Sequence, residues 1–349
     1  MARVRTRGVR ALGGLLAGIL ATCSLAACEE QQEQNTLVVL LTAGEPQERW
    51  GTLDRPELAR RVERTCLGCE FASYDAGGDA DQQAAQATEA LAAGADVLVL
   101  QATSPEAGEE IVVDAGPVPV VAYDRFVPGA DYFVGFDTEA AGRQQAGFVV
   151  RQVPRPSAVV IHGPGAGDPR SEVSRAAART LAAREIEVVA QTTPGSWSGE
   201  EAGRFVLDRL RERPVLGLGA VVAASDEQAA GIVRALADAD PPVRRPPAVV
   251  AVGAELAALR RIVRGEQAMT IAPPARAEAR QAADLAVTLV TGGSVSAPGE
   301  WEGVPAFVLP AAAVRLENLT NTVVRDGTVT TAQICDLETE PDCERLGIR

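Results

Sequence analysis

From residue 36 onward, short apolar runs alternate with longer segments in which apolar residues recur every three or four positions. The short runs, such as 36–41 and 96–100, are apolar at consecutive positions, as in parallel strands buried on both faces. The longer segments have the helical period, and Asp54 is placed to cap the first of them. The alternation predicts a chain of strand–helix–strand units. Strands are predicted over 36–41, 71–74, 96–100, 118–125, 132–136, 158–162, 186–190, 220–224, 248–252, 268–272 and 307–309, and further helices over 82–93, 106–115, 138–153, 172–183, 200–211, 227–237, 255–263 and 276–289.

The alternation restarts after residue 136, so the pattern predicts two similar halves. A length of 349 residues suits two domains better than one core. We therefore expect an α/β protein with two doubly wound parallel-sheet lobes, a crevice between them and several crossing segments that act as a hinge. The first lobe is expected to span 36–136 plus about 272–303, and the second 137–271 plus about 304–333, with 334–349 as a disulfide-closed tail.

The first 28 residues have a separate pattern. Four arginines between Arg3 and Arg10 precede a short apolar run over 11–21, which is too short to span a bilayer and is typical of a secretory signal peptide. The following Leu-Ala-Ala-Cys sequence, ending at Cys28, looks like a bacterial lipobox, which implies cleavage after residue 27 and lipidation of Cys28. The alternative is an ordinary small-residue cleavage site with an incidental cysteine. Residues 28–35 are polar and aperiodic, as in a flexible tether.

These features predict an extracytoplasmic protein held at the outer face of the membrane by acyl chains. Cleavage would remove four arginines and no acidic residue, which takes the formal net charge from −14 to −18. So acidic a surface argues against nucleic acid as a partner.

Four cysteines remain for an oxidising compartment, namely Cys66, Cys69, Cys335 and Cys343. Three pairings are possible, and the two local bonds, Cys66 with Cys69 and Cys335 with Cys343, are favoured. A redox motif at 66–69 would normally open a helix, whereas this one follows a helical segment and precedes a strand. A four-cysteine zinc site lacks the usual spacing.

The strand predicted over 118–125 ends on a carboxylate and a guanidinium, Asp124 and Arg125. Ligands of open α/β sheets bind at the carboxyl ends of the strands, so both side chains are expected to face the crevice. A carboxylate can accept two neighbouring hydroxyls, and a guanidinium can donate two parallel hydrogen bonds. The alternative is a simple ion pair at a strand end.

Several segments together resemble the periplasmic sugar-binding proteins of the ribose/xylose type, which are type I periplasmic binding proteins, and most of all the D-xylose-binding components of ABC transporters. The resemblance runs from about residue 36 to about residue 327. The segments that carry it are 48–50 (ERW), 94–100 (GADVLVL), 122–125 (AYDR), 136–139 (FDTE) with Gly142, Ser225-Asp226 with Gly231, Met269-Thr270, and 323–327 (VVRDG).

Carried over residue by residue, the resemblance implies sugar contacts from both lobes. Arg49, Asp124 and Arg125 would contact the hydroxyls from the first lobe. Asp168 would be the second lobe's carboxylate. Trp197, in a polar loop, would be the stacking platform, because a pyranose has an apolar C–H face that fits an aromatic ring. Arg170, Ser225 and Asp226 complete the expected set.

The second lobe departs from the family pattern. Arg170 and Ser225 stand where the family has asparagines, Gly253 replaces a carboxylate, and Pro273 replaces a lysine. The resemblance therefore implies a small polyhydroxylated ligand, with a pentose such as D-xylose favoured, and leaves its identity open.

The resulting hypothesis is a monomeric, lipid-anchored receptor that captures a neutral sugar and delivers it to an ABC permease, without cofactor or metal. A sensory module that feeds a membrane receptor or kinase is the alternative. An enzyme using Asp124 and Asp168 as acid and base is a third reading, but the chain has no phosphate loop or nucleophile elbow. The single histidine, His162, is expected to be structural.

Overall fold

The computed structural model describes residues 36–44, 49–153, 157–165, 167–212 and 218–348. The predicted signal peptide, the tether with Cys28, and Glu48 lie outside these ranges. Within them, no helix has the length and apolarity needed to cross a membrane.

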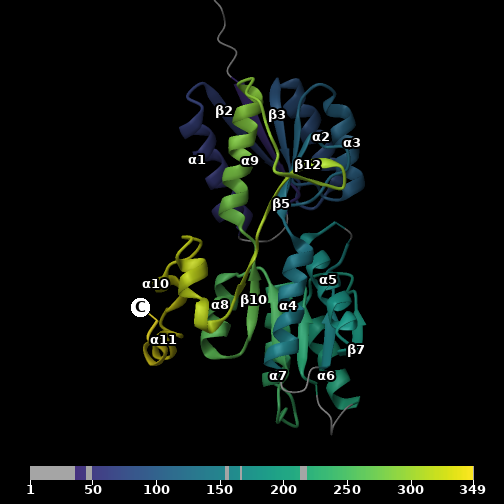
Figure 1. Ribbon diagram of the computed structural model, residues 1–349, viewed down its shortest axis with the longest axis vertical. Helices are drawn as coiled ribbons and strands as arrows, with labels where there is room; N and C mark the ends of the chain where they lie inside the picture. The colour runs from purple at the N-terminus through teal and green to yellow at the C-terminus, as the bar shows by residue number, and fades with distance from the viewer. Residues whose placement is uncertain (1–35, 45–48, 154–156, 166, 213–217, 349) are drawn as a thin grey trace, which may run out of the picture. The chain divides into compact units, whose positions relative to one another are not determined.

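The first lobe contains a seven-stranded sheet with the order β11-β12-β5-β4-β3-β1-β2. Every neighbouring pair is parallel except β11 and β12. The α1 and α9 helices cover one face, and α2 and α3 cover the other (Figure 1). The elements are β1 (Thr36–Thr42), the π-helical turn η1 (Trp50–Asp54), α1 (Arg55–Thr65), β2 (Cys69–Asp75), α2 (Ala80–Ala92), β3 (Ala95–Leu100), α3 (Pro105–Ala115), β4 (Val120–Tyr123), β5 (Tyr132–Phe136), α9 (Ala275–Val290), β11 (Gly299–Trp301) and β12 (Val304–Leu309).

The second lobe repeats this plan in a six-stranded sheet with the order β13-β10-β9-β8-β6-β7. Its first five strands in chain order are parallel, and β13 pairs antiparallel with β10. Both sheets thus have the doubly wound order. The second strand lies on one side of the first strand, and the later strands are added on its other side. The elements are α4 (Thr138–Gln152), β6 (Ser157–Ile161), α5 (Pro169–Ala183), β7 (Glu187–Thr192), α6 (Gly199–Glu212), β8 (Ala220–Ala223), α7 (Asp226–Ala237), β9 (Ala248–Val252), α8 (Leu256–Arg264), β10 (Met269–Ala272), β13 (Ala312–Val314), the short 3₁₀ and π turns η2 (Leu316–Asn318) and η3 (Thr320–Val324), α10 (Thr331–Ile334) and α11 (Glu340–Leu346).

The continuous apolar runs have a direct structural explanation. Successive side chains of a strand point to opposite faces, so Val39 and Leu41 enter one core while Val38 and Leu40 enter the other. All four are fully buried. The same division holds in the second lobe, for example at Val159 and Val160 of β6. This arrangement confirms the prediction of two parallel sheets covered on both faces.

Two glycines allow the covering helices to approach closely. A Cβ on Gly142 of α4 would lie 2.5 Å from the Cβ of Ala176 in α5. A Cβ on Gly231 of α7 would lie 2.0 Å from the carbonyl oxygen of Gly199 in α6. No larger residue fits at either crossing, because real Cβ atoms do not come this close to other heavy atoms.

Three short segments connect the lobes: 137, between β5 and α4; 273–274, between β10 and α9; and 310–311, between β12 and β13. The backbone amide of Asp137 donates to the carbonyl of Leu309, and the side chain of Gln144 donates to Ala311. The first and third crossings therefore lie side by side, which is the multiple connection expected of a hinge.

One expected lobe boundary differs from the structure. The segment from about residue 304 was assigned to the second lobe, but β12 pairs with β5 in the first sheet, so the chain crosses only after Leu309. The short strands β11 and β13 were also not predicted. Both lie at a sheet edge and pair with a single neighbour. Each has only three residues, a pattern too short to predict a strand from the sequence.

The cysteines form the two favoured local disulfides, Cys66 with Cys69 and Cys335 with Cys343. Cys66 follows α1 and Cys69 begins β2, which matches the expected order of helix, bond and strand. The C-terminal tail packs on α8, since Ile334 and Cys343 share a buried cluster with Leu259.

Candidate functional site

Asp124 and Arg125 directly follow β4, at the carboxyl end of the first sheet. Asp124 has a φ of 61°, a left-handed conformation that is uncommon outside glycine. Its amide donates to the carbonyl of Val134 in the neighbouring strand, which holds the turn in place. Both side chains are buried, so they lie within the protein rather than on an open strand end.

Arg49 is the centre of a charged cluster in the first lobe. Its guanidinium donates to Asp54 at 2.9 and 3.0 Å, to Glu278 at 2.8 Å and to Asp124 at 3.3 Å. The hydroxyl of Tyr123 also donates to Asp54. One guanidinium thus faces three carboxyl groups, which come from η1, the end of β4 and α9.

This ratio of charges determines how the cluster is protonated. Burial raises the pKa of Glu278 to about 8, because the attraction of Arg49 is opposed by the charges of Asp124 and Asp54. Burial likewise raises the pKa of Asp124 to about 6, against the attraction of Arg49. The cluster therefore retains a proton at neutral pH, and that proton is held by Glu278.

Asp168 organises the corresponding cluster of the second lobe. It caps α5 by accepting from the amide of Arg170, and its carboxylate accepts two further bonds from the Arg170 guanidinium at 3.0 and 2.7 Å. Arg125 of the first lobe donates to the same carboxylate at 3.1 Å. Burial acts to raise the pKa of Asp168, but the two guanidiniums outweigh it and hold the pKa below its ordinary value.

The bond between Arg125 and Asp168 links the two lobes directly. Arg125 is itself anchored to the first lobe, since it donates to the carbonyls of Ala102 and Thr103 at 3.0 and 3.2 Å. Both charged groups are nearly inaccessible, with side-chain exposures of 9% and 7%. A buried, hydrogen-bonded ion pair of this kind fixes one relative arrangement of its partners.

Trp197 lies against Arg170, whose guanidinium carbon is 3.7 Å from the ring centroid. The edge of the indole fits against Gly163, where a Cβ would be 2.2 Å from the ring. The ring is half-buried and belongs to the same group of residues as Asp168. A sugar that stacks on Trp197 would use the ring face opposite Arg170 or displace that guanidinium.

Ser225 and Asp226 serve the second lobe itself. The Ser225 hydroxyl caps α7 by accepting from the amide of Gln228. Asp226 is fully buried and accepts from Thr270, Gln267 and the amide of Glu255. Burial raises its pKa, although these donors and Arg261 oppose the shift. A direct ligand contact by either residue stays a prediction, and the bonds observed give both a supporting role.

Three acidic residues of the site were missed or misread from sequence. Glu278 was missed, although a carboxylate on the alanine-rich buried face of α9 is itself a signal of a special role. Asp54 was expected to cap α1, but its side chain makes no capping bond and binds Arg49 instead. Glu255 stands two residues after Gly253, where the family's carboxylate is replaced. The surrounding protein and the charge of Asp226 raise its pKa to about 7.

The remaining candidate, His162, makes hydrogen bonds within the second lobe. His162 bonds to the hydroxyl of Ser174 at 2.9 Å and to Gln191 at 3.3 Å, and burial lowers its pKa. In the described part of the chain, no group of three or more His, Cys, Asp and Glu side chains is arranged to hold a metal ion.

Comparisons with known proteins agree with this architecture. A family model described as the periplasmic binding protein domain matches residues 50–294. The D-xylose-binding periplasmic protein of Haemophilus influenzae is 30% identical over 292 residues, which cover 80% of this chain and 86% of the relative.

Solved structures show the same fold. A carbohydrate transporter solute-binding protein from Chloroflexus aurantiacus, in complex with D-glucose, superposes with a TM-score of 0.73 at 22% identity, covering 86% of this chain and 97% of the other. The Caulobacter myo-inositol binding protein gives a TM-score of 0.71 at 23% identity, with coverages of 84% and 98%.

These relatives are binding proteins and not enzymes, so the acid–base reading of Asp124 and Asp168 is set aside. The chain belongs to the periplasmic binding protein family and, within it, to the sugar-binding proteins of the ribose/xylose type.

Proposed function

We propose that this protein captures a small neutral sugar between its lobes and delivers it to an ABC permease. The observation that carries the proposal is the continuous polar group made by Arg49, Asp124 and Arg125 of one lobe with Asp168 and Arg170 of the other. The D-xylose-binding relative supports a pentose, and D-xylose is the first candidate.

The charge balance of the group supports a neutral ligand. Arg49 is matched by three carboxyl groups, one of which keeps its proton, and Asp168 is matched by two guanidiniums. By this count the first cluster has one excess negative charge and the second one excess positive charge, so together they have no net charge that would need a charged ligand for compensation. The paired groups still offer many charge-assisted donors and acceptors, which suits the hydroxyl rim of a sugar.

Capture would proceed by rotation about the three crossings. Sugar held by Asp124 and Arg49 would be enclosed when the second lobe brings Asp168 and Trp197 toward it, and the Arg125–Asp168 bond would hold the enclosing arrangement. Exclusion of water strengthens each charged hydrogen bond, because the local dielectric constant falls. A permease could then recognise the closed form.

Ligand identity can be tested in two steps. Mass spectrometry of small molecules released from the purified protein would name a bound sugar. A thermal-shift panel of pentoses, hexoses, inositols and polyols would then rank affinities, since a ligand present at one hundred times its Kd stabilises the folded state by about 2.7 kcal/mol. If no sugar or polyol in the panel raises the melting temperature, the proposal fails.

We also propose that acyl chains on Cys28 hold the protein at the outer face of the membrane, as the lipobox-like sequence predicts. The substitution Cys28→Ser is expected to move the protein from the membrane fraction to the soluble fraction. Equal membrane association of both forms would contradict the anchor.

A further inference from the structure

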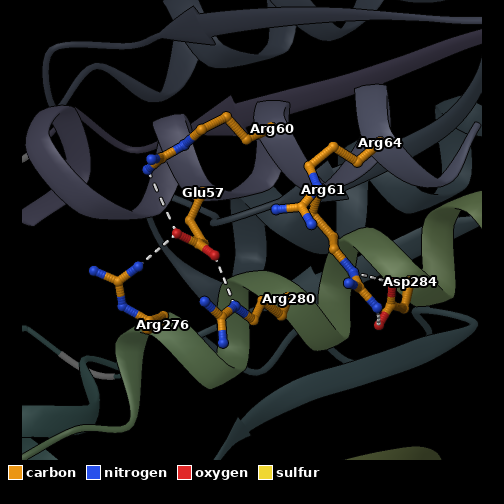
Figure 2. A pocket seen from close by; sticks show the side chains of 7 residues that line it. All are labelled: Glu57, Arg60, Arg61, Arg64, Arg276, Arg280 and Asp284. Atoms are coloured by element: carbon orange, nitrogen blue, oxygen red, sulfur yellow. Dashed lines mark hydrogen bonds and ion pairs between the residues drawn. The ribbon is translucent and has the colours of Figure 1, made fainter. Parts of the chain in front are cut away.

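A second polar site lies between α1 and α9, and its lining side chains are separate from the residues of the proposed sugar site. Seven residues line a pocket of about 530 Å³, and five of them are arginines. Figure 2 shows the arginines of α1 facing those of α9 across this pocket. The lining residues are Glu57, Arg60, Arg61, Arg64, Arg276, Arg280 and Asp284.

Two carboxylates organise the arginines. Glu57 accepts from Arg276 at 2.8 Å, from Arg280 at 2.7 Å and from Arg60 at 3.4 Å (Figure 2). Asp284 receives a two-pronged bond from Arg61 at 2.6 and 2.8 Å. Burial acts to raise the pKa of Glu57, but the surrounding arginines hold it below its ordinary value. Glu57 is therefore ionised at neutral pH.

The pocket nevertheless has an excess of positive charge. Five arginines face two carboxylates, an excess of three in a chain whose formal net charge is −14. The side chain of Arg64 has no hydrogen bond or ion pair with any described residue, and the Nε of Arg276 is buried without an acceptor among them.

This arrangement is unfavourable without a further anion. Arg60 and Arg64 are four residues apart on α1, as are Arg276 and Arg280 on α9, and like charges at this spacing destabilise a helix. Exposed ion pairs recover little of that cost. An anion that accepts from several guanidiniums at once would remove the repulsion and use the vacant donors.

We propose that the pocket between α1 and α9 binds a phosphate-bearing anion. A phosphate group fits the observations because guanidinium forks match its oxygens in pairs, and its charge approaches the excess of three. The same chemistry is offered by free phosphate and by the headgroup of an anionic phospholipid. The proposal does not depend on which sugar the protein binds.

The test uses the chain with Cys28→Ser, so that acylation cannot bind it to vesicles. Inorganic phosphate is titrated by isothermal calorimetry against sodium chloride of equal ionic strength. Binding to vesicles of phosphatidylglycerol and phosphatidylcholine is then compared with binding to phosphatidylcholine alone. The pocket variant is Arg60→Gln with Arg64→Gln, because Arg60 is 60% exposed and Arg64 is also exposed, so their replacement is expected to leave the buried core unchanged.

A matched control removes the same charge elsewhere. Arg204 and Arg211 of α6 are each 69% exposed, so Arg204→Gln with Arg211→Gln changes the net charge equally and leaves the pocket intact. We expect saturable binding by the parent and the control, and at least a tenfold loss of affinity in the pocket variant. The thermal shift produced by sugar should be the same in all three.

The two arms distinguish the sources. Binding of phosphate without selective binding of phosphatidylglycerol vesicles supports a free anion, and pocket-dependent binding of both supports a headgroup. Equal losses in the pocket variant and in the control, or no response beyond that of sodium chloride, would overturn the proposal.

Discussion

Replacement of Glu278 by glutamine is predicted to change the pH dependence of stability. Glutamine keeps the shape of the protonated carboxyl group and cannot ionise. Glu278 is fully buried and its pKa is raised to about 8 in the folded protein, compared with an ordinary value of 4.5. Between these two values the unfolded chain has released the proton while the folded protein retains it.

The sign of the effect follows from this difference. Because the unfolded state binds fewer protons, the free energy of unfolding falls as pH rises through this window, by about 1.4 kcal/mol per pH unit. From pH 5 to pH 8 the loss from this single group approaches about 4 kcal/mol, as an upper limit. In Glu278→Gln this contribution is absent. The variant should therefore gain stability relative to the parent by up to about 1.4 kcal/mol per pH unit until about pH 8.

Urea-induced unfolding, followed by circular dichroism at pH 5, 6, 7 and 8 without sugar, measures the effect. The matched control is Glu110→Gln, since Glu110 is an exposed glutamate of α3. Its stability difference from the parent should not change across the series. Parallel curves for Glu278→Gln and the parent between pH 5 and pH 8 would refute the reasoning that Glu278 holds the proton of the cluster.

Three further predictions concern the site, the packing and the tail. Asp124→Asn keeps a residue that tolerates positive φ, so the circular dichroism spectrum should be unchanged. Sugar affinity measured by calorimetry should fall at least tenfold, because a charge-assisted hydrogen bond is worth about 1.5–3 kcal/mol. Unaltered affinity would remove Asp124 from the site. Gly142→Ala should lower the free energy of unfolding by about 1–3 kcal/mol through overpacking. Gly68→Ala should not lower it, because nothing lies within 4 Å of the added Cβ, and equal effects of the two substitutions would contradict the packing argument. Replacing Cys335 and Cys343 by serine removes a disulfide between cysteines eight residues apart in sequence, and should destabilise the tail by about 2–3 kcal/mol in chemical unfolding. No change would mean that the disulfide adds nothing to the stability that the tail gains by packing on α8.

Some residues of the site could be predicted from the sequence, but the partners of Arg49 could not. Asp124 and Arg125 were predicted because a local pattern places them after a buried strand, and the structure puts both at the carboxyl end of β4. Arg49 was identified from the resemblance. Its three carboxyl partners were not predicted, because Glu278 is 229 residues away in sequence and reaches Arg49 only after α9 crosses back to the first lobe.

The same distinction applies to the fold. Local signals were sufficient for β1, β3 and the other buried strands, because burial on both faces requires a continuous apolar run. They were insufficient for β12, because the choice between two lobes depends on which sheet edge is free. The edge that β12 occupies is the one beside β5, and no local sequence pattern specifies that pairing.

The sequence by itself determined the repeated α/β plan, the local disulfides and the charged residues at strand ends, since each depends on neighbours within a few tens of residues. Tertiary structure alone decided that Asp54 binds Arg49 instead of capping a helix, that Arg125 and Asp168 link the lobes, and that five arginines of two helices meet in one pocket. The physical reason is that these effects are electrostatic and arise at distances of a few ångströms. Such distances are set by the packing of segments that lie far apart along the chain.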